Sequence, residues 1–135
     1  MHYLWQWDEL AHHWNNNEFH LVHDWLNQRW SKLIQSSPAG DKDPDARFLQ
    51  GLAFAALALY FTQNHNQEGA RLLLDDALMV LPQYAPSHQG IRIEPILETL
   101  HRLRPAISLL GPDDECPFQP FVYNRLVFER DMSNA

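Results

Sequence analysis

The chain has 135 residues, of which 45% are hydrophobic and 12% aromatic, and its formal net charge at pH 7 is −7. This much apolar surface can offset the entropy lost on folding, which excludes a wholly disordered chain, and the length fits one domain with a core. The negative charge, with no cluster of Lys or Arg to reverse it locally, disfavours binding to nucleic acid or to an anionic membrane surface.

Several features bear on where the protein resides. The single cysteine, Cys116, excludes an internal disulfide. Residues 1–14 carry Asp8 and Glu9 but no Lys or Arg, which is unlike the basic start of a signal peptide. The longest apolar run, residues 52–61, is too short to span a bilayer and is typical of a buried core helix. We therefore expect a cytoplasmic protein with no membrane partner.

Hydrophobic spacing predicts two helices near the N-terminus. Trp and Leu side chains at roughly helical spacing predict a first helix over residues 4–15. Residues 15–17 are all Asn and should end this helix and cap the next, because Asn side chains compete for backbone hydrogen bonds. Residues 18–34 then form a second helix. Its apolar stripe consists of Phe19, Val22, Leu26, Trp30 and Leu33.

A second pair of helices follows a loop rich in Pro, Gly and Asp at residues 36–45. The third helix, residues 44–63, is apolar on nearly all sides, which predicts a central and deeply buried position. Asp43 or Asp45 can cap its first turn. A tight turn leads into a fourth helix over residues 67–81.

The last part of the chain changes in character. A connector at residues 87–92 precedes a fifth helix over residues 93–103, which Pro105 should end or kink. Residues 111–135 are rich in Pro and then in aromatic and β-branched side chains. This composition predicts an extended segment, with a short helix or strand near residues 123–128.

Together these elements predict an all-α fold. We expect a single compact bundle of about five helices over residues 1–110 and a C-terminal extension, residues 111–135, that packs on the bundle or on a partner. The third and fourth helices resemble one tetratricopeptide-type hairpin, but arrays of that kind need about three or more repeats. We therefore interpret the hairpin as close packing of two helices through small side chains.

Two stretches of the sequence resemble the signatures of a known family, the bacterial and archaeal "domain of unknown function 309", over about residues 10–103. Phe19, His23, Asp24 and Trp30 fall on the first signature, and Phe48, Gln50, Gly51, Gly69 and Ala70 fall on the second. The resemblance implies a small helical bundle but no activity, because the family has no assigned function. Asp24 and Asn27 stand where the family usually has Glu, and the amide of Asn27 weakens any paired-carboxylate site.

A cluster of polar side chains on the second and third helices is the strongest candidate site. His23, Asp24 and Asn27 are neighbours on the helix surface, and Gln50 and Arg47 could meet them across the interface, with Arg47 pairing with Asp24. One interpretation is a pocket in which His23 is a base or metal ligand. The other, which we favour from the sequence, is a polar network inside the core that fixes helix register.

No metal site is predicted from the sequence, and no cofactor is named. A zincin helix would carry His-Glu-x-x-His, but the residue four positions after His23 is Asn27. His20 lies three positions before His23, which is a weak signal by itself. His12 and His13 could reach the second helix only if the first two helices are antiparallel neighbours.

The five tryptophans all lie in the first 30 residues. Trp14 and Trp30 are in phase with the core. Trp7 and Trp25 fall off the apolar stripe, so we expect them to be exposed or to lie at a contact. An exposed pair of this kind would mark a surface for a protein partner or for a homodimer.

The sequence contains no motif that identifies a reaction, since it has neither a phosphate-binding loop nor a nucleophile elbow. We therefore predict a small, soluble, helical protein that acts as a non-catalytic protein-interaction or self-association module. The alternative is a small enzyme or a ligand- or metal-binding protein that uses His23, Asp24, Asn27 and Gln50.

Overall fold

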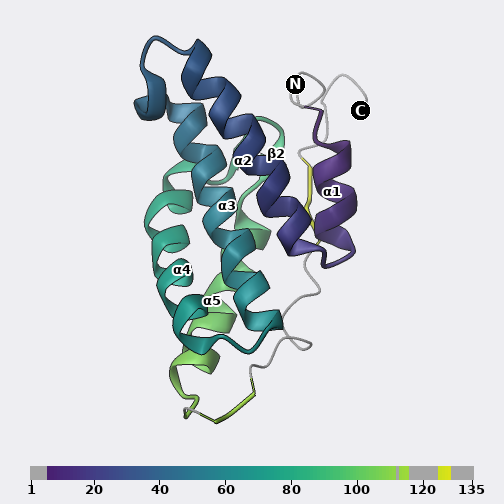
Figure 1. The fold of residues 1–135 in the computed structure, drawn as a ribbon, viewed down its shortest axis with the longest axis vertical. Coiled ribbons are helices and arrows are strands. Elements are labelled where there is room, and N and C mark those ends of the chain that lie inside the picture. Colours follow the sequence, from purple (N-terminus) through teal and green to yellow (C-terminus); the bar gives the residue numbers. More distant parts are fainter. Residues whose placement is uncertain (1–5, 112, 116–124, 129–135) are drawn as a thin grey trace.

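The computed structural model describes residues 6–111, 113–115 and 125–128, in which five α-helices form a bundle (Figure 1). The helices are α1 (Asp8–Asn15), α2 (Phe19–Ser36), α3 (Pro44–Gln63), α4 (Gln67–Val80) and α5 (Glu94–Ser108), with 3-10 helices η2 (Gly40–Lys42) and η3 (Leu81–Tyr84) and a hairpin of β1 (Ser87–His88) and β2 (Ile91–Arg92). The predicted all-α bundle is therefore confirmed. In the described part of the chain, no helix is long and apolar enough to cross a membrane.

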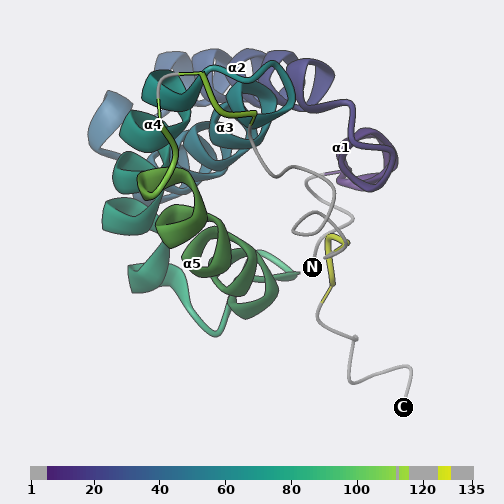
Figure 2. The same ribbon diagram turned by 90° about the horizontal axis from the view of Figure 1, so that it is seen from below.

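Helix α3 lies at the centre of the bundle, as its composition predicts. It packs against α2 on one side and α4 on the other (Figures 1 and 2). Its fully or almost fully buried side chains include Phe48, Leu49, Leu52, Ala55, Ala56, Ala58 and Leu59. Asp43 caps the helix, because its Oδ1 accepts hydrogen bonds from the N–H groups of Asp45 (2.8 Å) and Ala46 (3.3 Å).

The close approach of α3 to the end of α4 depends on Gly51. A Cβ atom built on Gly51 would lie 2.8 Å from Cγ1 of Val80 and 2.9 Å from Cδ2 of Leu81. Carbon atoms in good contact are about 3.5–4.0 Å apart, so a larger side chain would displace these neighbours. Glycine at this position therefore lets the backbone of α3 lie directly against the side chains of Val80 and Leu81.

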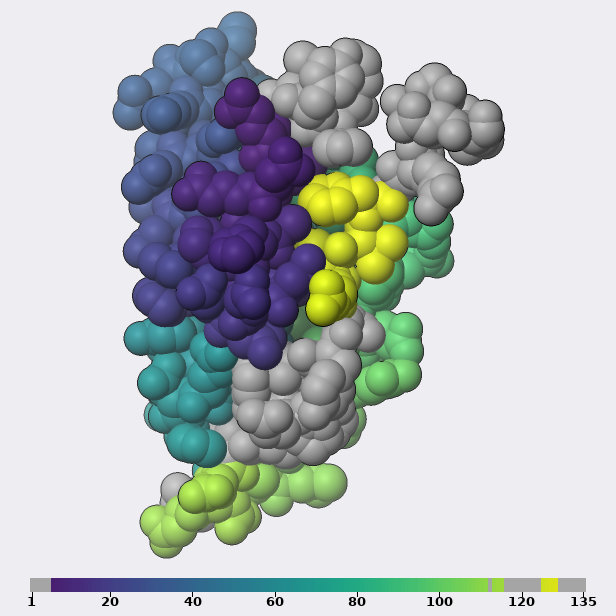
Figure 3. All heavy atoms as spheres, turned by 90° about the vertical axis from the view of Figure 1, so that its right-hand side faces the viewer, coloured from purple at the N-terminus to yellow at the C-terminus, as the bar shows by residue number. Residues whose placement is uncertain are grey.

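Residues 125–128 run beside α1 and the hairpin (Figures 1 and 3). The N–H of Leu126 donates to Oδ1 of Asn15 at 2.9 Å, and the N–H of Arg92 donates to the carbonyl of Val127 at 2.7 Å. The Leu126 side chain is only 5% exposed. Residues 125–128 of the C-terminal extension thus pack on the bundle. The structure also describes residue 111 and residues 113–115 of the predicted extension, where the N–H of Asp114 donates to the carbonyl of Gly111. Residues 112, 116–124 and 129–135 lie outside the described residues.

The beginnings of the first two helices differ from the prediction. Helix α1 begins at Asp8, because Gln6 has a φ of 55° and a left-handed residue cannot continue a right-handed helix. The Asn run does not cap α2, whose N-cap is Glu18 with no side-chain hydrogen bond. Instead, Asn15 accepts a hydrogen bond from the C-terminal segment, and Nδ2 of Asn16 donates to the carbonyl of His12 in α1.

Helix α5 continues past Pro105, where the sequence predicted an end or a kink. The last turn is held by packing, since Ile107 is fully buried. Nη2 of Arg71 in α4 also donates to the carbonyl of Ile107 at 3.2 Å. These tertiary contacts offset the backbone hydrogen bond that proline cannot donate.

Candidate functional site

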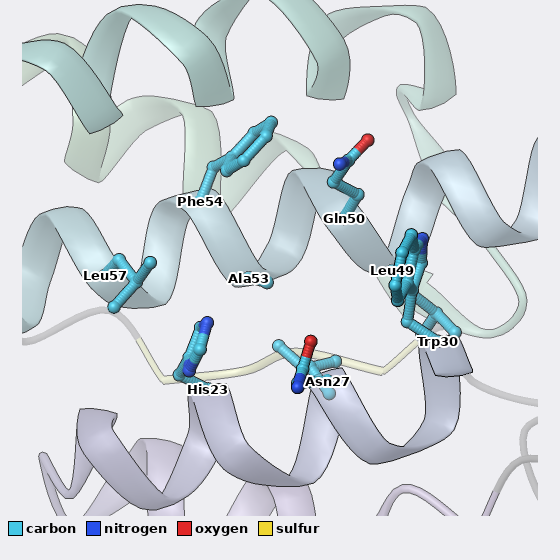
Figure 4. A pocket seen from close by; sticks show the side chains of 9 residues that line it. His23, Asn27, Trp30, Leu49, Gln50, Ala53, Phe54 and Leu57 are labelled. Carbon is cyan, nitrogen blue, oxygen red and sulfur yellow. The ribbon is translucent and has the colours of Figure 1, made fainter. Parts of the chain in front are cut away.

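A groove between α2 and α3 brings together three of the predicted site residues (Figure 4). His23 and Asn27 point from α2 toward α3, while Trp30 stands at one end of the groove and Leu57 at the other. The groove has a volume of about 130 Å³. Its nine lining residues are His23, Leu26, Asn27, Trp30, Leu49, Gln50, Ala53, Phe54 and Leu57.

The groove exists because α3 carries a small side chain where it faces α2. Ala53 lies between the two helices at the middle of the groove (Figure 4) and is half-buried. Leu26 and Leu49, which also line the groove, are fully buried. Protein interiors are otherwise close-packed, so a single methyl group at this interface leaves a recess with an apolar floor.

The predicted polar cluster is only partly assembled. Asp24 lies outside the groove with its side chain 69% exposed, and its Oδ1 is 3.7 Å from Nδ1 of His23. Nη1 of Arg47 donates to Oε1 of Gln50 at 3.4 Å. The expected pairing of Arg47 with Asp24 is wrong, because no ion pair joins these two described residues. The groove therefore keeps His23, Asn27 and Gln50.

The interpretation of these groups as a core network is also wrong. Asn27 is exposed, and His23 and Gln50 are half-buried. Among the described residues, the buried polar side chains are Thr62 and Thr99, and each donates to a carbonyl of its own helix. The polar groups of the groove thus lie at a rim that water reaches, where a ligand can meet them.

The predicted surface of Trp7 and Trp25 is buried, so their expected exposure is wrong. Trp7 is 0% exposed and its Nε1 donates to the carbonyl of Gln89 at 2.8 Å. Trp25 is 8% exposed and its Nε1 donates to Oε2 of Glu9 at 3.1 Å. The two ring centroids are 5.6 Å apart. Contacts with segments distant in sequence bury both indoles, and the helical phase of α2 does not reveal such contacts.

A histidine–aspartate contact that the sequence did not suggest joins the hairpin to α3. Nε2 of His88 lies 2.7 Å from Oδ1 of Asp45, and the His88 ring packs against Phe48 and Tyr84. The Tyr84 hydroxyl donates to the carbonyl of Pro44 at 2.8 Å, and burial raises its pKa. These contacts hold the hairpin over the start of α3, and we assign them a structural role.

A second group of ionisable side chains lies at the turn between α1 and α2. His12, His13 and Glu18 each offer a donor atom, and these atoms all lie within 4.8 Å of one another. The hydrogen bond from His13 is the main cause of the lowered pKa of the Glu18 carboxyl. The sequence shows the histidine pair, but the position of Glu18 depends on the reversal at Asn17, whose φ is 61°.

Comparison with known proteins identifies a family but no characterised relative. The family model for a domain of unknown function (DUF309) matches residues 7–73. This match confirms the resemblance seen in the sequence motifs, although it ends earlier than residue 103. It includes both helices of the groove. No curated protein and no solved structure matches the chain.

Proposed function

The chain belongs, through residues 7–73, to the DUF309 family, whose function is unknown. We propose that this member of the family has a non-catalytic binding role. In this role the groove between α2 and α3 receives one apolar side chain of a partner protein. The proposal is supported by the size of the groove, by the chemistry of its lining and by the charge of the chain.

The volume of the groove, about 130 Å³, is the observation that carries the proposal. Pockets for drug-sized ligands enclose roughly 300–1,000 Å³. An engineered core cavity of about 150 Å³, in contrast, holds one benzene molecule. The groove therefore matches a single ring or branched aliphatic side chain. Anchors of this kind, seated in pockets, carry much of the energy of many protein interfaces.

The lining of the groove suits binding better than acid–base catalysis. His23 is the one titratable side chain among the nine lining residues. The nearest carboxylate to it in the described ion pairs, that of Asp24, lies outside the groove. The amides of Asn27 and Gln50 can donate and accept hydrogen bonds with the main chain of a bound segment. The apolar floor of the groove would then hold the side chain of the partner, and the polar rim would set the direction of the partner's main chain.

The charge of the chain favours a different protein over a second copy as the partner. Two copies with a formal net charge of −7 repel each other at long range, whereas a basic partner is attracted. Large exposed hydrophobic side chains do occur on the described part of the chain, such as Leu72 and Met79 of α4. Insertion of α4 into the groove of another copy would be a heterologous contact, which builds rings or open filaments.

The test compares proteins captured from a cell extract by three forms of the chain: wild type, Ala53→Leu and Ala106→Leu. Both substitutions enlarge a half-buried alanine, but only Ala53 lies in the groove. A partner held by wild type and Ala106→Leu and lost by Ala53→Leu, with direct binding then measured between purified proteins, would support the proposal. Equal capture by all three forms would contradict it.

Sedimentation provides the check on self-association. We expect a monomer at micromolar concentrations, because the like charge of two copies opposes their approach. A dimer that Ala53→Leu dissociates and Ala106→Leu leaves intact would make a second copy the occupant of the groove.

A further inference from the structure

We propose that His12, His13 and Glu18 form a binding site for a divalent transition-metal ion, for which Zn²⁺ is the matched probe. The site lies at the turn between α1 and α2 and is independent of the groove. Two imidazole nitrogens and one carboxylate oxygen are the donors found in open zinc sites, where a fourth position is left to water. Hard cations such as Mg²⁺ prefer sites made of oxygen atoms alone.

The backbone of the turn places the three donors on one side. Asn17 adopts a left-handed conformation, and the N–H of Glu18 donates to the carbonyl of His13 at 2.9 Å. This reversal sets the Glu18 side chain beside the last turn of α1, where His12 and His13 lie. The carboxylate oxygen Oε1 of Glu18 is 2.9 Å from Nδ1 of His13.

The spacing of the donors is close to what a metal requires. Bonds of about 2.0–2.2 Å in a tetrahedral site put neighbouring donors roughly 3.3 Å apart. The His13–Glu18 pair, at 2.9 Å, is about 0.4 Å closer than this and has to separate slightly to admit the ion. The three donors lie within 4.8 Å of one another, so His12 has to move inward by about 1.5 Å at most. Its side chain is exposed, and a rotamer change can supply that movement.

The carboxylate of Glu9 lies near the ring nitrogen of His13 that does not face Glu18. Nε2 of His13 lies 3.9 Å from Oε1 of Glu9, while Nδ1 faces Glu18. The other oxygen of Glu9 accepts the hydrogen bond from Nε1 of Trp25 in α2, which anchors the carboxylate. At 3.9 Å this contact is longer than a hydrogen bond. If it closes when the metal binds, Glu9 would orient the His13 ring and raise its basicity, as carboxylates usually do for histidine ligands.

The simpler interpretation is an ion pair between His13 and Glu18 with a solvated His12 beside it. The two interpretations differ in their demand on His12. An ion pair does not need His12, whereas a three-donor metal site loses a ligand when it is removed. Substitution of His12 therefore separates them without disturbing the His13–Glu18 hydrogen bond.

The experiment is isothermal titration calorimetry of the full chain, without an affinity tag, with ZnCl₂ and with MgCl₂ as the control ion. The variants are His12→Ala, His13→Gln and Glu18→Gln, and the matched control is His101→Ala, an exposed histidine on α5. Circular dichroism verifies that each variant keeps its helices. Histidine ring NMR signals recorded during the titration report directly on His12 and His13.

We expect one Zn²⁺ per chain in wild type and His101→Ala, no response to Mg²⁺, and at least tenfold weaker binding in each of the three ligand variants. Glu9→Gln should weaken Zn²⁺ binding by about tenfold or more while leaving one site. Binding that His12→Ala leaves unchanged would overturn the proposal, as would Zn²⁺ binding that none of the three ligand substitutions weakens. Ring NMR signals of His12 and His13 that do not change when Zn²⁺ is added would also overturn the proposal.

Discussion

Substitution of Leu126 tests whether the C-terminal segment belongs to the core. Its side chain is 5% exposed, and its N–H is tied to Asn15 of α1. The adjacent Val127 is 42% exposed, although its carbonyl accepts the hydrogen bond from Arg92. Leu126→Ala and Val127→Ala therefore shorten neighbouring side chains while leaving the same backbone hydrogen bonds in place.

The magnitude follows from the burial of the two side chains. Leu→Ala substitutions in protein cores cost about 2–5 kcal/mol, and sites at the edge of a core collapse more easily and fall at the lower end. We expect Leu126→Ala to lower the free energy of unfolding by about 2–3 kcal/mol. For a chain of this size that loss lowers Tm by about 10 °C. Val127→Ala should cost less than about 1 kcal/mol, because its side chain is already in contact with water.

The assay is urea unfolding followed by circular dichroism at 222 nm, with the m-value checked for each protein. An unchanged m-value with a lower midpoint is the expected result for Leu126→Ala. A difference of less than about 0.5 kcal/mol between the two variants would refute the reasoning, because it would mean that Leu126 is not part of the core.

Two further predictions concern the helices around the groove. Gly51→Ala should destabilise the protein by about 1–2 kcal/mol in urea unfolding. The new Cβ would lie too close to Val80 and Leu81, and the cost of this crowding outweighs a gain in helix propensity of about 1 kcal/mol. A more stable variant would contradict the packing described. The hydrogen bond from the Ser37 hydroxyl, together with two backbone N–H groups, lowers the pKa of the Asp43 carboxyl in the folded protein. The charged carboxylate therefore stabilises the fold at any pH above the ordinary pKa of Asp. This stabilisation is lost as the pH falls through the lower pKa of the folded state. Wild type should exceed Asp43→Asn in stability at pH 7, and the gap should narrow in melting curves recorded as the pH falls below the ordinary pKa of an Asp carboxyl. A gap that stays constant with pH would exclude the charge as its source.

The helices that the sequence predicted well are those whose signals are local. For α3, the predicted range of residues 44–63 equals the observed one, because a capping Asp and a long apolar run define its start and its body. Helix α4 ends one residue before its predicted end at residue 81. Helix α5 was predicted too short, because the buried Ile107 and its hydrogen bond from Arg71 are tertiary contacts.

The burial of Trp7 and Trp25 could not be predicted for a related reason. Trp25 is off the apolar stripe of α2 and Trp7 precedes α1, so the helical period says nothing about what lies over either indole. The carbonyl that Trp7 meets belongs to Gln89, 82 positions further along the chain. A contact between residues so far apart in sequence depends on the fold, and it cannot be inferred from the spacing of hydrophobic residues along one helix.

The candidate site was predicted in part. His23, Asn27 and Gln50 were expected to meet across two helices, and all three line the groove, because spacing along a helix fixes which residues share a side. The groove itself depends on Ala53, and an alanine in a helix that is apolar on all sides gives no signal that it borders a recess. The metal-site proposal likewise depends on the left-handed Asn17, which orients Glu18 toward α1.

The central claim is that the recess between α2 and α3 binds one ring-sized group. It is tested most directly by ¹H–¹⁵N NMR of ¹⁵N-labelled protein titrated with benzene, for wild type and Ala53→Leu. We expect saturable shifts centred on Leu26, Ala53 and Leu57 in the wild type, and none at the equivalent sites in Ala53→Leu, where the added side chain fills the recess. Shifts that do not saturate, or that persist unchanged in Ala53→Leu, would contradict the claim.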